Sequence, residues 1–96
     1  MRKLVLYAPE DMDGEKLYKL VKALRDEAKL LKLDFSGPYF NTDGRLIVYY
    51  EDDEIRTFIY VDDLENELNP ERIRATIKVL ALIAMDKEEE IYIENL

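Results

Sequence analysis

The stretch RLIVYYEDDEIRTFIYV, residues 45–61, decides the class of fold that the chain can adopt. Residues 45–51 and 54–61 are rich in β-branched and aromatic side chains, which favour strands. Asp52 and Asp53 lie between these two segments and are typical of a tight turn. The stretch therefore predicts two antiparallel strands near the middle of the chain.

A strand and a helix are expected before this pair of strands. Residues 2–8 are rich in strand-forming side chains, and Pro9 ends that segment. Residues 15–33 repeat apolar side chains with the helical period, and Asp11 or Asp13 is the candidate N-cap. The stripe that would face the core consists of Leu17, Leu20, Val21, Leu24, Ala28 and Leu31.

The segment between that helix and the two strands gives mixed signals. Residues 36–38, Ser-Gly-Pro, are typical of a break in regular structure. Residues 41–44, Asn-Thr-Asp-Gly, predict a type I turn that ends in a left-handed glycine. Tyr39 and Phe40 form either a short strand that pairs with residues 45–51 or part of a loop, and the sequence leaves both open.

A second helix is expected to begin at residue 70. Asn69 is a good N-cap, Pro70 suits the first helical position, and Glu71 lies near the positive end of the helix dipole. We expect this helix to run to about Met85, and residues 89–94 predict a last strand. The core stripe of the helix consists of Ile73, Ile77, Leu80 and Ala84.

The expected fold class is α+β: a two-layer α/β plait, βαββαβ, with a possible extra short strand before the second main strand. This order resembles the split βαβ arrangement of ferredoxin-like domains over nearly the whole chain. In such a plait both helices cover one face of the sheet and leave the other face open. The resemblance implies a fold and leaves the function open, because one fold hosts many functions.

Composition limits the possible functions. A chain of 96 residues, 48% of them hydrophobic, predicts a single domain over residues 1–96. Without cysteine or histidine it has no disulfide, no thiolate and neither the commonest general base nor the commonest transition-metal ligand. No apolar run approaches the roughly 18 residues of a membrane span, and the first apolar stretch is too short for a signal peptide. A cytoplasmic or recombinant location is therefore expected.

Caps, turns, helix periods and strand composition all favour the same structure. In this respect, and in its lack of cysteine, the chain resembles an idealised, computationally designed protein. That resemblance implies a thermostable, non-catalytic scaffold or protein-interaction domain without a cofactor. The net charge of −8 supports an alternative, a natural acidic inhibitor of a basic nucleic-acid-handling protein. Anti-CRISPR proteins, nuclease immunity proteins and DNA mimics are similar to the chain in size and charge.

Several aromatic side chains are expected on the open face of the sheet. Strict alternation along the strands makes them a candidate interaction face, which consists of Tyr7, Tyr49, Phe58, Tyr60 and Tyr92. The segment RTFIYV, residues 56–61, is similar to part of the RNA-recognition-motif signature, which implies base stacking on this face. Because phosphate contacts supply most of the affinity for nucleic acids, the charge of −8 argues against RNA or DNA as a partner.

Residues 50–53, Tyr-Glu-Asp-Asp, have the Y-x-D-D form of the hairpin motif in palm-type polymerases and reverse transcriptases. That resemblance implies a Mg²⁺ site shared with the acidic residues that follow the first strand, Glu10, Asp11 and Asp13. The chain has no room for the other parts of a polymerase, and two aspartates in a turn need no metal. We therefore expect no catalytic residue and no metal site.

The second helix has more apolar residues than a helix with one buried side needs. Val79, Leu82 and Met85 lie outside its core stripe. Together with the aromatic face they exceed the apolar surface that a monomer usually exposes. The sequence therefore predicts a homodimer or a protein partner, without membrane contact, and a well-filled monomer core is the alternative.

Overall fold

The computed structural model of the protein describes residues 1–65 and 67–94, with side chains as far as residue 86. The described elements follow the order β1-α1-β2-β3-β4-α2. Their bounds are β1 Lys3–Pro9, α1 Gly14–Leu30, β2 Asp34–Asn41, β3 Leu46–Glu51, β4 Arg56–Asp62 and α2 Pro70–Glu94. The first strand, the first helix and the central pair of strands expected from the sequence are confirmed.

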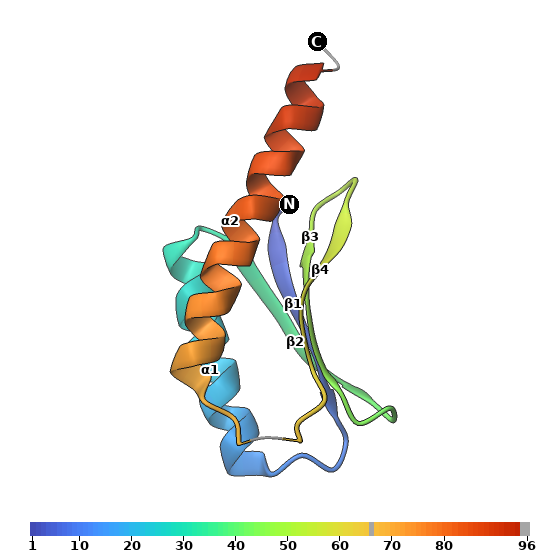
Figure 1. Ribbon diagram of the computed structural model, residues 1–96, viewed down its shortest axis with the longest axis vertical. Coiled ribbons are helices and arrows are strands. Elements are labelled where there is room, and N and C mark those ends of the chain that lie inside the picture. Colours follow the sequence, from blue (N-terminus) through green and yellow to red (C-terminus); the bar gives the residue numbers. More distant parts are fainter. Residues whose placement is uncertain (66, 95–96) are drawn as a thin grey trace.

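Figure 1 shows a two-layer α+β arrangement in which both helices lie on the same side of a four-stranded mixed sheet. The order of the strands across the sheet is β2-β1-β3-β4. β1 pairs with β2 in parallel and with β3 antiparallel, and β4 pairs antiparallel with β3. β1, α1 and β2 thus form a βαβ unit, and β3 and β4 form the hairpin that follows it.

The expected βαββαβ order, and with it the ferredoxin-like plait, is wrong at the C-terminal end. Residues 89–94 are helical and belong to α2, whose last part projects beyond the sheet (Figure 1). In a plait the last strand would pair with the outer edge of β1, and here β2 occupies that edge. No glycine or proline follows Pro70 within α2, so nothing in the local sequence stops the helix at Met85.

The segment with mixed signals, residues 34–41, is a complete strand, and it pairs with β1 rather than with β3. The expected hairpin between residues 39–40 and β3 is therefore wrong. β2 lies at the edge of the sheet, where proline is tolerated because its missing N–H leaves no ladder bond unmade. Gly37 and Pro38, joined by a cis peptide bond, lie opposite the single residue Leu6, and this register shift accommodates the Gly-Pro pair.

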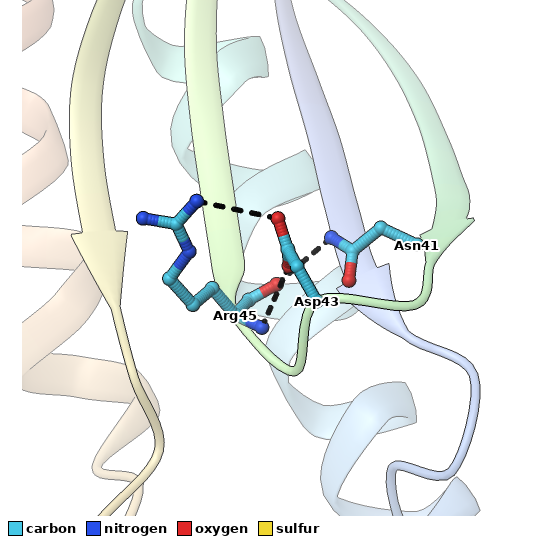
Figure 2. A network of polar contacts seen from close by, with 3 residues as sticks. All are labelled: Asn41, Asp43 and Arg45. Carbon is cyan, nitrogen blue, oxygen red and sulfur yellow. Dashed lines mark hydrogen bonds and ion pairs between the residues drawn. The ribbon is translucent and has the colours of Figure 1, made fainter.

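The loop from β2 to β3 passes the end of β1, because β1 lies between those two strands. Gly44 has a φ of +77°, as expected for the left-handed end of the turn. Figure 2 shows the polar contacts of the loop: the backbone N–H of Arg45 donates to Oδ1 of Asp43 at 3.0 Å, and Nδ2 of Asn41 donates to the Arg45 carbonyl at 2.9 Å. The N–H of Glu10 donates to the Asn41 carbonyl at 3.2 Å and ties the loop to the end of β1.

Both helices begin at the caps that the sequence indicates. Oδ2 of Asp13 accepts from the N–H of Lys16 at 3.1 Å, and Oδ1 of Asn69 accepts from the N–H of Arg72 at 3.2 Å. The apolar stripes of the helices pack on one face of the sheet. The buried core there consists of Leu4, Leu6, Ala8, Leu20, Leu24, Ala28, Leu33, Leu46, Val48, Tyr50, Ile59, Ile73, Ile77, Ala81 and Ala84. In the described ranges, neither helix combines the length and apolar content needed to cross a membrane.

An ion pair joins the two helices inside this layer. Glu27 on α1 is 3% exposed, and its Oε2 accepts from Nε of Arg74 on α2 at 2.7 Å. That hydrogen bond raises the pKa of the Arg74 guanidinium. The second carboxylate oxygen of Glu27 is buried and accepts no hydrogen bond from the described residues. Because burial of a charge is costly when its oxygens are not all satisfied, this pair is a weak source of stability.

Replacing both Glu27 and Arg74 with apolar residues is expected to leave the stability of the protein unchanged or higher. Replacing Arg74 alone is expected to lower it. Glu27→Leu/Arg74→Leu is expected to be at least as stable as the parent, because an apolar pair fills the same space. Arg74→Leu leaves a buried carboxylate without its donor and is expected to be less stable than the double variant. Urea denaturation of the parent and both variants measures this order. A double variant less stable than Arg74→Leu would contradict it.

Gly37 provides a second test of the fold. It has a φ of +120°, and an added Cβ would lie 2.6 Å from the carbonyl oxygen of Leu6. Gly37→Ala is therefore expected to lower the free energy of unfolding by roughly 2–4 kcal/mol, through backbone strain and overlap with β1. Gly14→Ala is the matched control, because a Cβ there meets no atom within 4 Å, and its effect is expected to stay within about 1 kcal/mol. Equal denaturation midpoints for the two variants would contradict the close approach of β2 to β1.

Candidate interaction surface

Four aromatic rings, one from each strand, lie side by side on the sheet face opposite the helices. Tyr7 pairs with Tyr39 in the strand register and Tyr49 pairs with Phe58, and residues directly opposite each other point to the same face. From β2 to β4, successive ring centroids are 5.4, 5.6 and 4.5 Å apart, which are normal distances for aromatic contacts. We call these residues the aromatic row, in the order Tyr39, Tyr7, Tyr49 and Phe58. The row crosses the whole width of the sheet.

Arg56 lies over the middle of the aromatic row. Its guanidinium carbon is 4.0 Å from the ring centroid of Tyr49 and 5.7 Å from that of Tyr7, within the range of a cation–π interaction. Its Nη2 donates to the Tyr7 hydroxyl at 3.2 Å, and this bond raises the pKa of the guanidinium. At the β2 end of the row, the hydroxyls of Ser36 and Tyr39 are 2.6 Å apart and share a hydrogen bond. These contacts hold the rings and the guanidinium in position within the chain.

The row is most exposed at its two ends. Phe58 is 62% exposed and Tyr39 is 47% exposed, whereas the two inner rings are half-buried. Val5 and Ile47 lie on the same face and are only 3% and 9% exposed, because the neighbouring rings exclude water from them. The aromatic part of this face is thus accessible mainly toward the two edges of the sheet.

One of the five residues expected on this face, Tyr60, lies on the opposite face. The β3–β4 register pairs Val48 with Tyr60 and Tyr49 with Phe58, so Ile59 is an extra residue in a bulge. The bulge reverses the alternation, and Tyr60 packs against the core on the helix side, where its hydroxyl donates to Oδ2 of Asp62 at 2.7 Å.

Tyr92 belongs to α2 rather than to a strand, and its side chain lies outside the described residues. Tyr7, Tyr49 and Phe58 are therefore the three expected residues that the fold brings together. Sequence reasoning missed Tyr39 and Arg56. Arg56 precedes Phe58 by two residues, so alternation along the strand would have placed it on the same face as Phe58. Tyr39 had no such signal, because its place depends on the pairing of β2 with β1.

Four charged residues form a second line across the same face. Lys3 pairs with Asp34 on one side and with Glu51 on the other, and Glu51 pairs with Arg56. In the order of the strands their charges alternate, and we call them the charge row, Asp34, Lys3, Glu51 and Arg56. The row contributes no net charge, although the chain as a whole carries −8. The acidic excess of the chain therefore belongs to residues outside this row.

The Asp52-Asp53 turn and the acidic loop after β1 lie at opposite ends of the sheet. β3 is antiparallel to β1, so the turn lies beside the N-terminus, where Asp53 forms an ion pair with the Met1 ammonium at 3.0 Å. Residues 10–13 follow the other end of β1, roughly 20 Å away for a strand of seven residues. The shared acidic site implied by the resemblance to polymerase palms is therefore wrong in its geometry.

Asp52 stabilises the turn in which it lies. Its Oδ1 accepts from the backbone N–H groups of Glu54 at 2.7 Å and Ile55 at 2.6 Å. Within the part of the chain that the structure describes, no three carboxylate, imidazole or thiol side chains are grouped closely enough to hold a metal ion. The two hydrogen bonds provide a sufficient structural reason for an aspartate at this position.

Comparisons of this chain with protein-family models, with curated proteins and with solved structures find no match. The molecule is a small α+β domain with a four-stranded mixed sheet and two helices. Its candidate site is the open face of that sheet, with the aromatic row and the charge row.

The partial burial of Tyr60 predicts a pH dependence at the opposite, helix-covered face. Burial, followed by the hydrogen bond to Asp62, raises the pKa of Tyr60 to about 12 from its ordinary value of 10.0. The folded state therefore favours the neutral phenol, so the stability that Tyr60 contributes is complete below pH ~10 and is lost between about pH 10 and pH 12. Denaturation midpoints are expected to fall more steeply over that range for the parent than for Tyr60→Phe. Parallel pH profiles would contradict the burial of this phenol.

Proposed function

We propose that this chain is a non-catalytic protein-interaction domain that binds its partner through the open face of the sheet. The observation that carries the proposal is the aromatic row, with four contacting rings and Arg56 above them. Tyrosine and arginine are enriched among the residues that dominate the binding energy of protein interfaces. Rings that are already held by their neighbours lose little conformational freedom when they bind.

The chemistry of the chain supports binding rather than catalysis. The sequence has neither histidine nor cysteine, and Asp52 accepts two backbone hydrogen bonds in its turn. Nucleic acid is a poorer candidate for the same face. The rings could stack on bases, but the charge row has no net positive charge with which to bind phosphates.

The caps and the helix periods also support a stable scaffold, and high thermal stability is part of the proposal. Other features are atypical of idealised design. Two strand pairs have register shifts, Lys32 and Leu64 have positive φ, and one buried oxygen of Glu27 accepts no hydrogen bond from the described residues. These irregularities argue against an idealised design.

A phage-displayed library of random peptides, selected on the folded protein, tests the proposal. The selected peptides are expected to bind Phe58→Ala at least about tenfold more weakly than the parent, because the most exposed ring of the row is lost. Tyr18→Ala is the matched control, since Tyr18 is an exposed aromatic residue on α1 with 70% of its surface accessible. Peptide affinity for this control is expected to equal that for the parent.

Peptides that bind Phe58→Ala as tightly as the parent would contradict the proposal. If those peptides were rich in lysine and arginine, the acidic-inhibitor alternative would replace it, because their contacts would lie on acidic surfaces. Single-stranded oligonucleotides at low salt are expected not to bind at micromolar concentrations in fluorescence anisotropy. Oligonucleotide binding that Phe58→Ala abolishes would favour the RNA-recognition alternative.

A further inference from the structure

We infer that a second copy of this chain occupies the open face, with the two sheets packed face to face about a two-fold axis parallel to the strands. This inference rests on the proposed function, since it names the partner that the open face binds. Its basis is the charge row, whose alternating signs make the face complementary to itself. Closed two-fold interfaces use the same patch on both subunits and therefore need this kind of complementarity.

The symmetry of the charge row defines the arrangement. A two-fold axis parallel to the strands reverses the order in which the strands of the second copy face those of the first. The strands of the two copies still run in the same direction, so the same ends of both sheets lie together. β2 of one copy then faces β4 of the other, and β1 faces β3. The position of Lys3 faces that of Glu51 of the second copy, and the position of Asp34 faces that of Arg56, so facing positions in the row carry opposite charges. The Arg56 guanidinium itself extends inward over Tyr49, so Lys3 and Glu51 form the central charge contact. Aligned packing of two sheets about 10 Å apart is a common geometry in proteins.

The same axis brings the apolar side chains of the two faces together. Tyr39 lies at the same level along the strands as Tyr7, Ile47 and Val61, so it faces Val61 of the second copy, and both side chains are about half-exposed in the monomer. In the middle of the interface, Tyr7 faces Ile47 of the second copy and Tyr49 faces Val5 of the second copy. Such a contact removes apolar surface from water and leaves the hydroxyls near charged or polar neighbours.

The size of the face predicts a weak dimer. Four strands about 4.8 Å apart and about seven residues long cover roughly 19 Å by 23 Å, which is below the roughly 800 Å² per partner of a standard interface. The charge of −8 on each copy adds long-range repulsion that salt screens, whereas contact pairs inside the interface are screened less. The dimer is therefore expected to have a micromolar dissociation constant that decreases as salt is added.

Charge reversal in the row, followed by sedimentation of the full chain, tests the arrangement. Lys3→Glu and Glu51→Lys each place two like-charge contacts in the dimer, and each is expected to raise the dissociation constant about tenfold or more. Glu51→Lys is the more informative variant, because it lowers the net negative charge and would strengthen association if only overall repulsion mattered. An equimolar mixture of the two variants, one of them fluorescently labelled, is expected to form a heterodimer about as tight as the parent dimer.

Two further variants separate this interface from other causes of weakened association. Phe58→Ser removes an exposed ring, is expected to leave the circular dichroism melt unchanged and is expected to weaken the dimer. Leu82→Ser changes an exposed apolar residue on α2 and is expected to leave the dimer intact. Dimerisation lost in Leu82→Ser and retained in Phe58→Ser would overturn the inference and place the interface on α2.

Two other results would also overturn the inference. One is a parent protein that stays monomeric at about 100 μM in both low and high salt, where a micromolar dimer would be populated. The other is a mixture of Lys3→Glu and Glu51→Lys that associates no better than either variant alone. If the parent is monomeric while library peptides still lose affinity for Phe58→Ala, the proposed function stands and only the second copy as partner is excluded.

Discussion

β1 is paired along both of its edges, buried on its helix side and largely covered on its other side, and the other elements are arranged around this strand. Leu4, Leu6 and Ala8 are completely buried on the helix side, and Val5 is 3% exposed among the aromatic rings on the other side. A strand buried in this way needs a hydrogen-bonding partner at each edge, because an unpaired backbone group cannot reach water there. β3 supplies one partner, β2 supplies the other, and residues 89–94 then remain in α2.

The same pairing builds the candidate surface. Without β2 beside β1, the aromatic row would end at Tyr7 and the charge row would lack Asp34. When a row of three alternating charges faces its own reversed copy, every charge meets one of the same sign. When a row of four does so, every charge meets one of the opposite sign. The edge position of β2 therefore links the packing of the core to the self-complementarity of the open face.

Single extra residues in two strand pairs decide which side chains reach that face. Because side chains alternate along a strand, one inserted residue moves the following residues to the opposite face. At Ile59 such a bulge places Tyr60 on the helix-covered face of the sheet, while Phe58 lies on the open face. At Gly37 and Pro38 a similar shift places Tyr39 beside Tyr7, where their rings are 5.4 Å apart. The aromatic row is thus a product of pairing irregularities as much as of composition.

The sequence by itself determined the features that depend on residues a few positions apart. These are the strands within residues 45–61, the two helix caps, the apolar stripes and the positions of Tyr7, Tyr49 and Phe58, since capping and periodicity act locally. Only the tertiary structure decided which segment occupies the second edge of β1. Local preference favours a break at Gly37, but the free energy of pairing β2 with β1 depends on a strand that is distant in the chain, and it outweighs that local preference. Residues 89–94 have strand-forming side chains but no residue that stops a helix, so local sequence alone does not choose between the two structures.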